Sequence, residues 1–222
     1  MNKNENLKKI TVTALFCALA FLMTFMFRFK VSFLTFDFKD AIISVVSLLY
    51  GPVFGVVSAG IVAVLEFLSV SDTGVYGLIM NFISSGVFAL ACGSVYKLKR
   101  SFSGAIISVI TSVISVTVVM LAANIFITPF YMGVEKSQVI ALIPTLLFPF
   151  NLCKSIINAT ALLIIYKPIT TALKKSKLVA GENATYKLTA KTVVLTVVSL
   201  LILIFAVLFV VLVLKGDFTF IK

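Results

Sequence analysis

Most of this sequence consists of apolar runs close to the ~20 residues that a helix needs to cross a lipid bilayer. Strands of a membrane barrel would instead alternate polar and apolar residues over ~10-residue segments. The chain is 61% hydrophobic and only 12% charged, whereas about 25% of the residues in a soluble domain are charged. Too few polar residues remain to cover a water-facing surface. The sequence therefore predicts an all-α, multi-pass protein of the cell membrane without a soluble domain.

Apolar segments and basic linkers divide the chain into three parts. We expect a six-helix domain over residues 1–175, a basic cytoplasmic linker over 176–191, and an additional transmembrane helix with a tail over 192–222. The second helix is short for a full crossing, so we expect it to tilt or to pack inside the bundle. The predicted helices cover about residues 10–27, 40–50, 53–70, 76–96, 103–127, 139–166 and 192–214.

The net charge of +11 would suit a nucleic-acid binder, but the positions of the cations favour another interpretation. Most lysines and arginines lie in short segments between predicted helices, where their distribution indicates which side of the membrane each segment faces. They concentrate in residues 1–9, 97–100 and 167–191, which alternating helices place on one side of the membrane. We therefore expect a cytoplasmic N-terminus and no nucleic-acid partner.

Lys154 is the most unusual residue of the predicted membrane helices, because it lies in the otherwise uncharged segment 142–166. A cation at the centre of a bilayer costs about 2.5–3.5 kcal/mol on insertion scales. Asn151 lies one helical turn before Lys154, so both side chains project from the same face. One interpretation is a structural lysine that pairs with a carboxylate or extends to the surface. The other is a ligand contact inside a membrane-embedded pocket.

Other polar residues lie near the predicted outer ends of the helices. Glu66 is costly in a membrane, and we expect it either to pair with Lys154 or to bind a ligand. A carboxamide offers two donors and an acceptor, so converging asparagines suit a heterocycle with alternating C=O and N–H groups. Each asparagine alone can also hold two helices together. These asparagines are Asn81, Asn124, Asn151 and Asn158.

The predicted outer loop 27–41 combines several phenylalanines with Asp37, Lys39 and Asp40. Aromatic residues at this position are either interfacial anchors or a lid that covers a flat ligand while polar groups fix its edges. Asp40 begins an apolar helix and is also a candidate N-cap.

Small residues form two strips that allow helices to approach closely. Ala14 and Ala18, with Ala20, form the first strip, which either packs inside the bundle or docks on another membrane protein. Gly55 and Ala59 belong to the second strip, on the third predicted helix, and we expect this strip to pack internally.

Motifs for catalysis and metal binding are missing from the sequence. It has no histidine, no nucleotide-binding loop and no nucleophile with an adjacent base, so we predict no catalytic residue, no metal site and no cofactor. Cys17, Cys92 and Cys153 lie in apolar segments and are expected to be small buried hydrophobic residues. A membrane enzyme or scaffold with Glu66 and Lys154 as an acid–base pair is the competing hypothesis.

Four segments, in this order, resemble the riboflavin-specific S components of energy-coupling factor (ECF) transporters: TFDFKDAIISVVSLLYGPVFGV, GLIMNFISSGVFAL, NIFITPFY and PFNLCKSI. The resemblance covers about residues 10–175. It implies a six-helix fold that binds one vitamin from outside the cell. It also implies a membrane-embedded T component and two cytoplasmic ATPase subunits as partners, with the S component toppling in the membrane to release its ligand inward.

The resemblance also implies roles for individual residues. Asn124, Asn151 and Lys154 would contact the isoalloxazine ring or ribityl chain of riboflavin. Ala14 and Ala18 would dock the T component. Further candidate ligand contacts are Thr35, Phe36, Asp37, Asp40, Glu66 and Asn81.

The sequence leaves more than one candidate for the ligand. Ile125 departs from the family pattern, in which members often have tyrosine. A phosphate would require more than one cation, which favours riboflavin over FMN, but Lys30 and Lys39 near the expected mouth keep FMN as an alternative. Another vitamin or a nucleobase-like compound is the second hypothesis.

Overall fold

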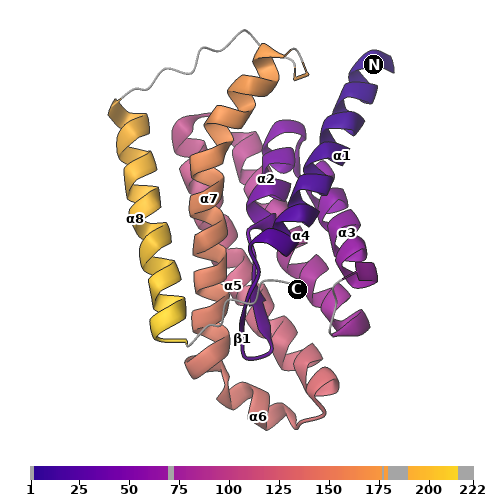
Figure 1. Ribbon diagram of the computed structural model, residues 1–222, viewed down its shortest axis with the longest axis vertical. Coiled ribbons are helices and arrows are strands. Elements are labelled where there is room, and N and C mark those ends of the chain that lie inside the picture. Colours follow the sequence, from indigo (N-terminus) through magenta and orange to yellow (C-terminus); the bar gives the residue numbers. More distant parts are fainter. Residues whose placement is uncertain (1–2, 70–72, 177, 180–189, 215–222) are drawn as a thin grey trace.

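The computed structural model describes residues 3–69, 73–176, 178–179 and 190–214 (Figure 1). The described part is a helical bundle with one short hairpin, which confirms the prediction of an all-α protein. The helices are α1 (Lys3–Met26), α2 (Lys39–Tyr50), α3 (Pro52–Ser69), α4 (Gly74–Leu98), α5 (Phe102–Met132), α6 (Lys136–Ala141), the π-helical turn η1 (Ile143–Leu147), α7 (Phe148–Lys175) and α8 (Ala190–Leu212). The strands are β1 (Phe29–Val31) and β2 (Leu34–Phe36).

Six described helices are long and apolar enough to cross a membrane: α1, α3, α4, α5, η1 continuing into α7, and α8. The twelve residues of α2 span only ~18 Å at 1.5 Å per residue, short of a ~30 Å hydrocarbon core. The prediction of a six-helix core plus a seventh spanning helix therefore holds only in part, since α8 is one of the six candidates. A seventh crossing is not established in the described residues, and α2 packs inside the bundle, with Val45 and Val46 fully buried.

Figure 1 shows that the helices run between two ends of the bundle. The start of α1 and the end of α7 lie at one end, and the hairpin and α6 lie at the other. This arrangement agrees with the loop alternation used above, while the cytoplasmic placement of the N-terminus stays a prediction. Most of the predicted linker 176–191 and the tail 215–222 lie outside the described residues.

The segment predicted as an outer loop contains the antiparallel hairpin β1–β2. Its register pairs Phe29 with Phe36, Lys30 with Thr35 and Val31 with Leu34. Because successive side chains of a strand point to opposite faces, the Lys30–Thr35 pair lies on one face and the two apolar pairs lie on the other. The alternation in FKVSFLTF is the sequence signal for this hairpin.

The junction of α2, α3 and α4 is closely packed around Ser47, whose hydroxyl donates to Ala89 O at 2.6 Å. A Cβ at Gly55 would lie 2.6 Å from Ser47 Cβ, and one at Gly93 would meet Ser47 Oγ and lie 3.0 Å from Pro52 Cα. Ala59, on the same strip as Gly55, is fully buried, which confirms internal packing of this strip. The three cysteines are also buried and free, as predicted.

Gly93→Ala is expected to lower the free energy of unfolding by about 1–3 kcal/mol, because the added methyl group would overpack this junction. Gly86→Ala is the matched control on the same helix. A Cβ at Gly86 would lie 3.9 Å from Phe82 Cε2, an ordinary contact, so this change should be neutral or stabilising. Unfolding of both variants in detergent measures the difference, and equal effects would contradict the packing argument.

Candidate ligand-binding site

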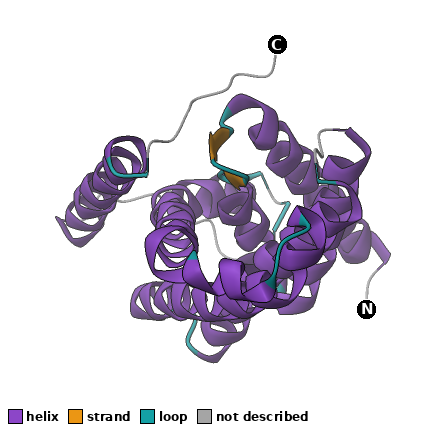
Figure 2. Cartoon of the chain, turned by 90° about the horizontal axis from the view of Figure 1, so that it is seen from below, coloured by secondary structure: helices purple, strands orange, loops and turns teal. Residues whose placement is uncertain are grey.

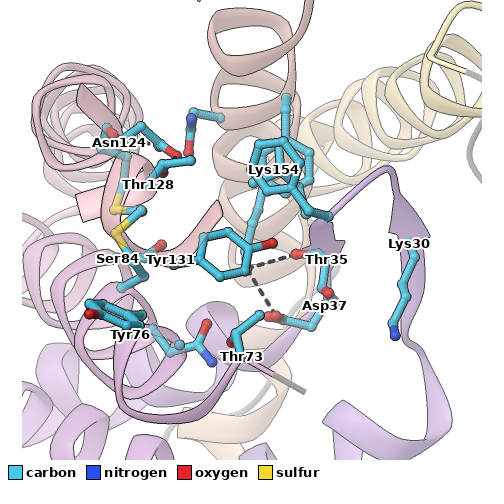
Figure 3. Close-up of a pocket in the computed structure, with 18 of the residues that line it drawn as sticks. Lys30, Thr35, Asp37, Thr73, Tyr76, Ser84, Asn124, Thr128, Tyr131 and Lys154 are labelled. Atoms are coloured by element: carbon cyan, nitrogen blue, oxygen red, sulfur yellow. Dashed lines mark hydrogen bonds and ion pairs between the residues drawn. The ribbon is translucent and has the colours of Figure 1, made fainter. Parts of the chain in front are cut away.

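A cavity of about 310 Å³ lies at the hairpin end of the bundle (Figure 3). Small-molecule sites usually have volumes of ~300–1,000 Å³, so this cavity suits one small ligand. Its described lining residues come from α1, the hairpin, α2, α3, α4, α5 and α7, and none comes from α8. All of these lining residues fall between residues 24 and 154, within the part of the chain for which the sequence showed the resemblance.

Most of the predicted ligand contacts line this cavity. The predicted residues that line it are Thr35, Asp37, Glu66, Asn81, Asn124, Asn151 and Lys154. Their convergence from five separate parts of the sequence gives the cavity a polar wall of carboxamide, ammonium and carboxylate groups.

Phe36 does not line the cavity, contrary to the prediction. Its ring is fully buried, stacked on Phe29 at a centroid distance of 4.9 Å and packed against Phe150 at 4.3 Å. Strand alternation explains the difference, because Thr35 faces the cavity and Phe36 must then face away.

Asp40 does not line the cavity either, and it is not an N-cap. Phe38 occupies the N-cap position of α2, while Asp40 lies in the first turn of that helix. Its Oδ1 accepts a hydrogen bond from Ser85 Oγ at 2.5 Å, which joins α2 to α4. Asp40 is thus a buried structural carboxylate.

Lys154 extends from α7 to the hairpin, as the dashed lines in Figure 3 show. Its Nζ lies 2.9 Å from Asp37 Oδ2 and donates to Thr35 O at 3.1 Å. Lys154 and Glu66 therefore do not pair with each other, which removes one of the two alternatives for Glu66. The acid–base pair that the enzyme hypothesis required is not formed, because each group has another partner.

Glu66 pairs with Lys39, whose Nζ lies 2.8 and 2.7 Å from the two carboxylate oxygens. Asn81 Nδ2 donates to the same carboxylate at 2.9 Å. Lys39 is only 2% exposed. The sequence had suggested a cation near the mouth of the site, but Lys39 is buried and paired. Only the presence of both charges in the sequence pointed to this pairing.

Asp37 Oδ2 lies near both lysines, 2.9 Å from Lys154 Nζ and 3.5 Å from Lys39 Nζ. Burial raises the pKa of the Asp37 carboxyl, but the charges of Lys154 and Lys39 outweigh burial and hold this pKa below its usual range. Asp37 is therefore ionised at neutral pH and links both ion pairs at the cavity wall.

The asparagines fall into two groups. Asn158 is structural, because its Oδ1 accepts from Ala41 N at 2.9 Å and its Nδ2 donates to Asp37 O at 2.8 Å. Asn124 and Asn151 line the cavity, and each donates to the backbone of its own helix, at Met120 O and Leu147 O. Their side chains are thereby held in fixed orientations.

The helix that carries Asn151 and Lys154 is broken where a single helix over 139–166 was predicted. The short α6 ends at Ala141, and the π-helical turn η1 leads into α7. Pro144 and Pro149 remove two backbone donors in this region, which is compatible with a local departure from α-helical bonding. Single π turns are frequent at functional sites.

Several lining residues were missed by sequence reasoning. Thr128 and Tyr131 follow Asn124 on the same face of α5, beyond the predicted end of that helix at residue 127. Thr128 Oγ1 donates to Asn124 Oδ1 at 2.9 Å. Helical spacing from Asn124 identifies both residues once the helix is extended past residue 127 to Met132.

The hairpin covers one side of the cavity. Phe33 at its turn lies 5.9 Å, between ring centroids, from Tyr131 on α5, and both residues line the cavity. The Lys30–Thr35 face also lines it. The hairpin therefore lies where a lid over this cavity would be, and its role as a lid stays a prediction.

Comparisons with known proteins agree with this arrangement. The sequence model of the family described as "ECF transporter, substrate-specific component" matches residues 8–166. The riboflavin transporter RibU of Staphylococcus aureus (strain TCH60) is 30% identical over 79% of this chain and 96% of its own length. The riboflavin transporter FmnP of Bacillus subtilis (strain 168) is 27% identical over 72% of this chain and 90% of its own. A solved S component of a bacterial ECF transporter is 27% identical, with a TM-score of 0.66 over 76% of this chain and 99% of that one.

Proposed function

The chain belongs to the family of substrate-specific components of ECF transporters, and from this premise we propose that it captures riboflavin from outside the cell. Members of this family are transport proteins rather than enzymes. The cavity beside the hairpin supports the proposal, because it combines a lid with carboxamides on α5 and α7. A T component and two cytoplasmic ATPase subunits would then drive delivery into the cell.

Riboflavin suits this cavity for chemical reasons as well. The ligand is flat and uncharged, and its ring edge alternates hydrogen-bond donors and acceptors that Asn124 and Asn151 can match. Phe33 and Tyr131 offer aromatic surface for the ring. The relatives in S. aureus and B. subtilis, which share 27–30% of their residues with this chain, are named riboflavin transporters.

FMN fits the site less well than riboflavin. Both buried ammonium groups, on Lys39 and Lys154, already pair with carboxylates at 2.7–2.9 Å. A phosphate group at either of them would have to break its ion pair and would also meet the Asp37 carboxylate. Riboflavin carries no phosphate, so it can bind without breaking an ion pair or placing a second anion beside Asp37. Arg28 and Lys30 also line the cavity, which keeps FMN as the alternative ligand.

Binding by the purified full-length protein in detergent tests this proposal. Riboflavin fluorescence should be quenched on titration, and riboflavin should raise the unfolding temperature more than FMN or an unrelated vitamin does. Another vitamin that stabilises the protein while riboflavin does not would replace riboflavin as the ligand. No stabilisation by any vitamin would count against the capture function itself.

The outer face of α1 is the proposed docking surface for the T component. Ala14 and Ala18 are exposed, whereas Ala20 is fully buried and belongs to the interior. Small residues on an exposed face let another membrane helix approach closely. Figure 2 shows α8 at the edge of the bundle, and Figure 1 places it on the side away from α1, so α8 leaves this face open.

Ala18→Leu is expected to abolish riboflavin uptake in cells that carry the partner subunits, while riboflavin binding by the purified protein stays unchanged. The larger side chain would hold the partner helix away. Ala122→Leu, at an exposed alanine on α5, is the matched control and should keep uptake. Loss of binding in Ala18→Leu would instead place this residue in the packing of the bundle.

A further inference from the structure

The apolar face of the hairpin is buried in a cluster that includes α8. This face carries Phe29, Val31 and Phe36, all less than 4% exposed. In the same buried cluster, α7 contributes Phe150, Cys153 and Ile157, and α8 contributes Ala206 and Val210. The hairpin, α7 and α8 therefore share one apolar core that is separate from the main core of the bundle.

The two faces of the hairpin have different neighbours. Lys30 and Thr35 line the cavity, whereas Phe29, Val31 and Phe36 on the opposite face lie in the cluster with α7 and α8. Leu34 at the end of that face packs against the cluster and also lines the cavity. No described residue of α8 lines the cavity. Any influence of α8 on a ligand must therefore pass through the hairpin or α7.

We infer that α8 acts as a brace that holds the hairpin closed over the cavity and slows release of the ligand. Val210 is fully buried and Ala206 is 5% exposed, although the outer face of α8 is widely exposed, for example at Phe205 and Leu212. Only the side of α8 toward α7 and the hairpin is thus packed. The inference rests on the proposed function for the identity of the ligand.

The match to the family ends at residue 166, before α8 begins at Ala190. The part of the chain that matches the family thus carries the hairpin, and α8 adds Ala206 and Val210 to the buried cluster in which the apolar face of the hairpin lies. An opening motion of the hairpin would expose Phe29 and Phe36 and separate them from the cluster. Because Ala206 and Val210 of α8 also belong to this cluster, opening the hairpin would expose more apolar surface and cost more free energy.

Val210→Phe tests the brace in the full-length protein. The larger ring would overpack the cluster and displace α8. Riboflavin dissociation should become at least about tenfold faster, the change that 1.4 kcal/mol gives. Val197→Phe, at a position of α8 that is 49% exposed, is the matched control and should leave dissociation unchanged.

Cys153 gives a second readout that requires no ligand. It is free, 9% exposed and part of the cluster, so displacement of α8 should speed its alkylation by a small apolar maleimide. Mass spectrometry separates Cys153 from Cys17 and Cys92, which lie in other clusters. Val210→Ala, which removes volume without overpacking, repeats the test if the larger change prevents folding.

The outcomes separate the brace from the proposed function. If the wild type binds no riboflavin, the ligand proposal fails, and Cys153 alkylation still tests the packing of α8. If Val210→Phe speeds both alkylation and dissociation relative to Val197→Phe, the brace is supported. Unchanged dissociation in a protein that binds riboflavin would overturn it, whether or not Cys153 becomes more reactive.

Discussion

Lys154→Met is expected to weaken riboflavin binding by about 100-fold or more, equivalent to ~2.8 kcal/mol. The ammonium group holds Asp37 at 2.9 Å and the Thr35 carbonyl at 3.1 Å, so its loss removes the hydrogen bond that joins β2 to α7 at the cavity wall. It also leaves the buried Asp37 carboxylate with Lys39 alone, at 3.5 Å. Fluorescence titration with riboflavin measures the effect. Lys136→Met, at an exposed lysine of α6, is the control and should bind normally.

A double variant distinguishes the two roles of Lys154. Asp37→Asn in the Lys154→Met background removes the unpaired carboxylate, so the unfolding temperature should recover toward that of the wild type. If Lys154 also contacts riboflavin, binding stays weak in the double variant. Recovery of both stability and binding would show that Lys154 acts only as a structural ion-pair partner.

Glu66→Gln is expected to lower the free energy of unfolding by about 3–5 kcal/mol, the usual cost of breaking a buried ion pair by removing one partner. The neutral amide cannot compensate Lys39, and its NH₂ group would meet another donor at either Lys39 Nζ or Asn81 Nδ2. Unfolding in detergent without ligand measures this loss. Glu135→Gln, at an exposed glutamate, should have no comparable effect.

Replacing both partners tests whether charge pairing is the cause. The variant Lys39→Met with Glu66→Met carries no unpaired charge at these positions, so it should be more stable than either single methionine variant. A double variant as unstable as Glu66→Gln would mean that the carboxylate is needed for another reason, such as its bond with Asn81.

The sequence predicted which polar residues matter better than it predicted their partners. Lys154, Asn124 and Asn151 were recognised because polar groups in apolar helices are costly, and all three line the cavity. The pairing of Lys154 with Asp37 joins residues 117 positions apart. Helical periodicity gives the face on which a residue lies but not the neighbouring helix, so the sequence left the partner of Glu66 open and did not point to Lys39.

The hairpin shows a different limit of sequence reasoning. The alternation of Phe29, Lys30 and Val31 is typical of a strand, but three-residue strands are shorter than the usual periodic signal. The resemblance grouped Phe36 with Thr35 as ligand contacts, although neighbours on a strand face opposite sides. The predicted docking role of Ala14 and Ala18 stays a prediction that the uptake experiment decides.

The separation of the paired charges along the chain has a consequence for biosynthesis. Lys39 and Glu66 are 27 positions apart, so this pair can form as soon as α3 follows α2 into the membrane. Asp37 must wait for Lys154, which is synthesised 117 residues later. The nascent protein therefore carries an incompletely neutralised carboxylate until α7 arrives. The charged wall of the cavity is thus complete only after α7 has been inserted.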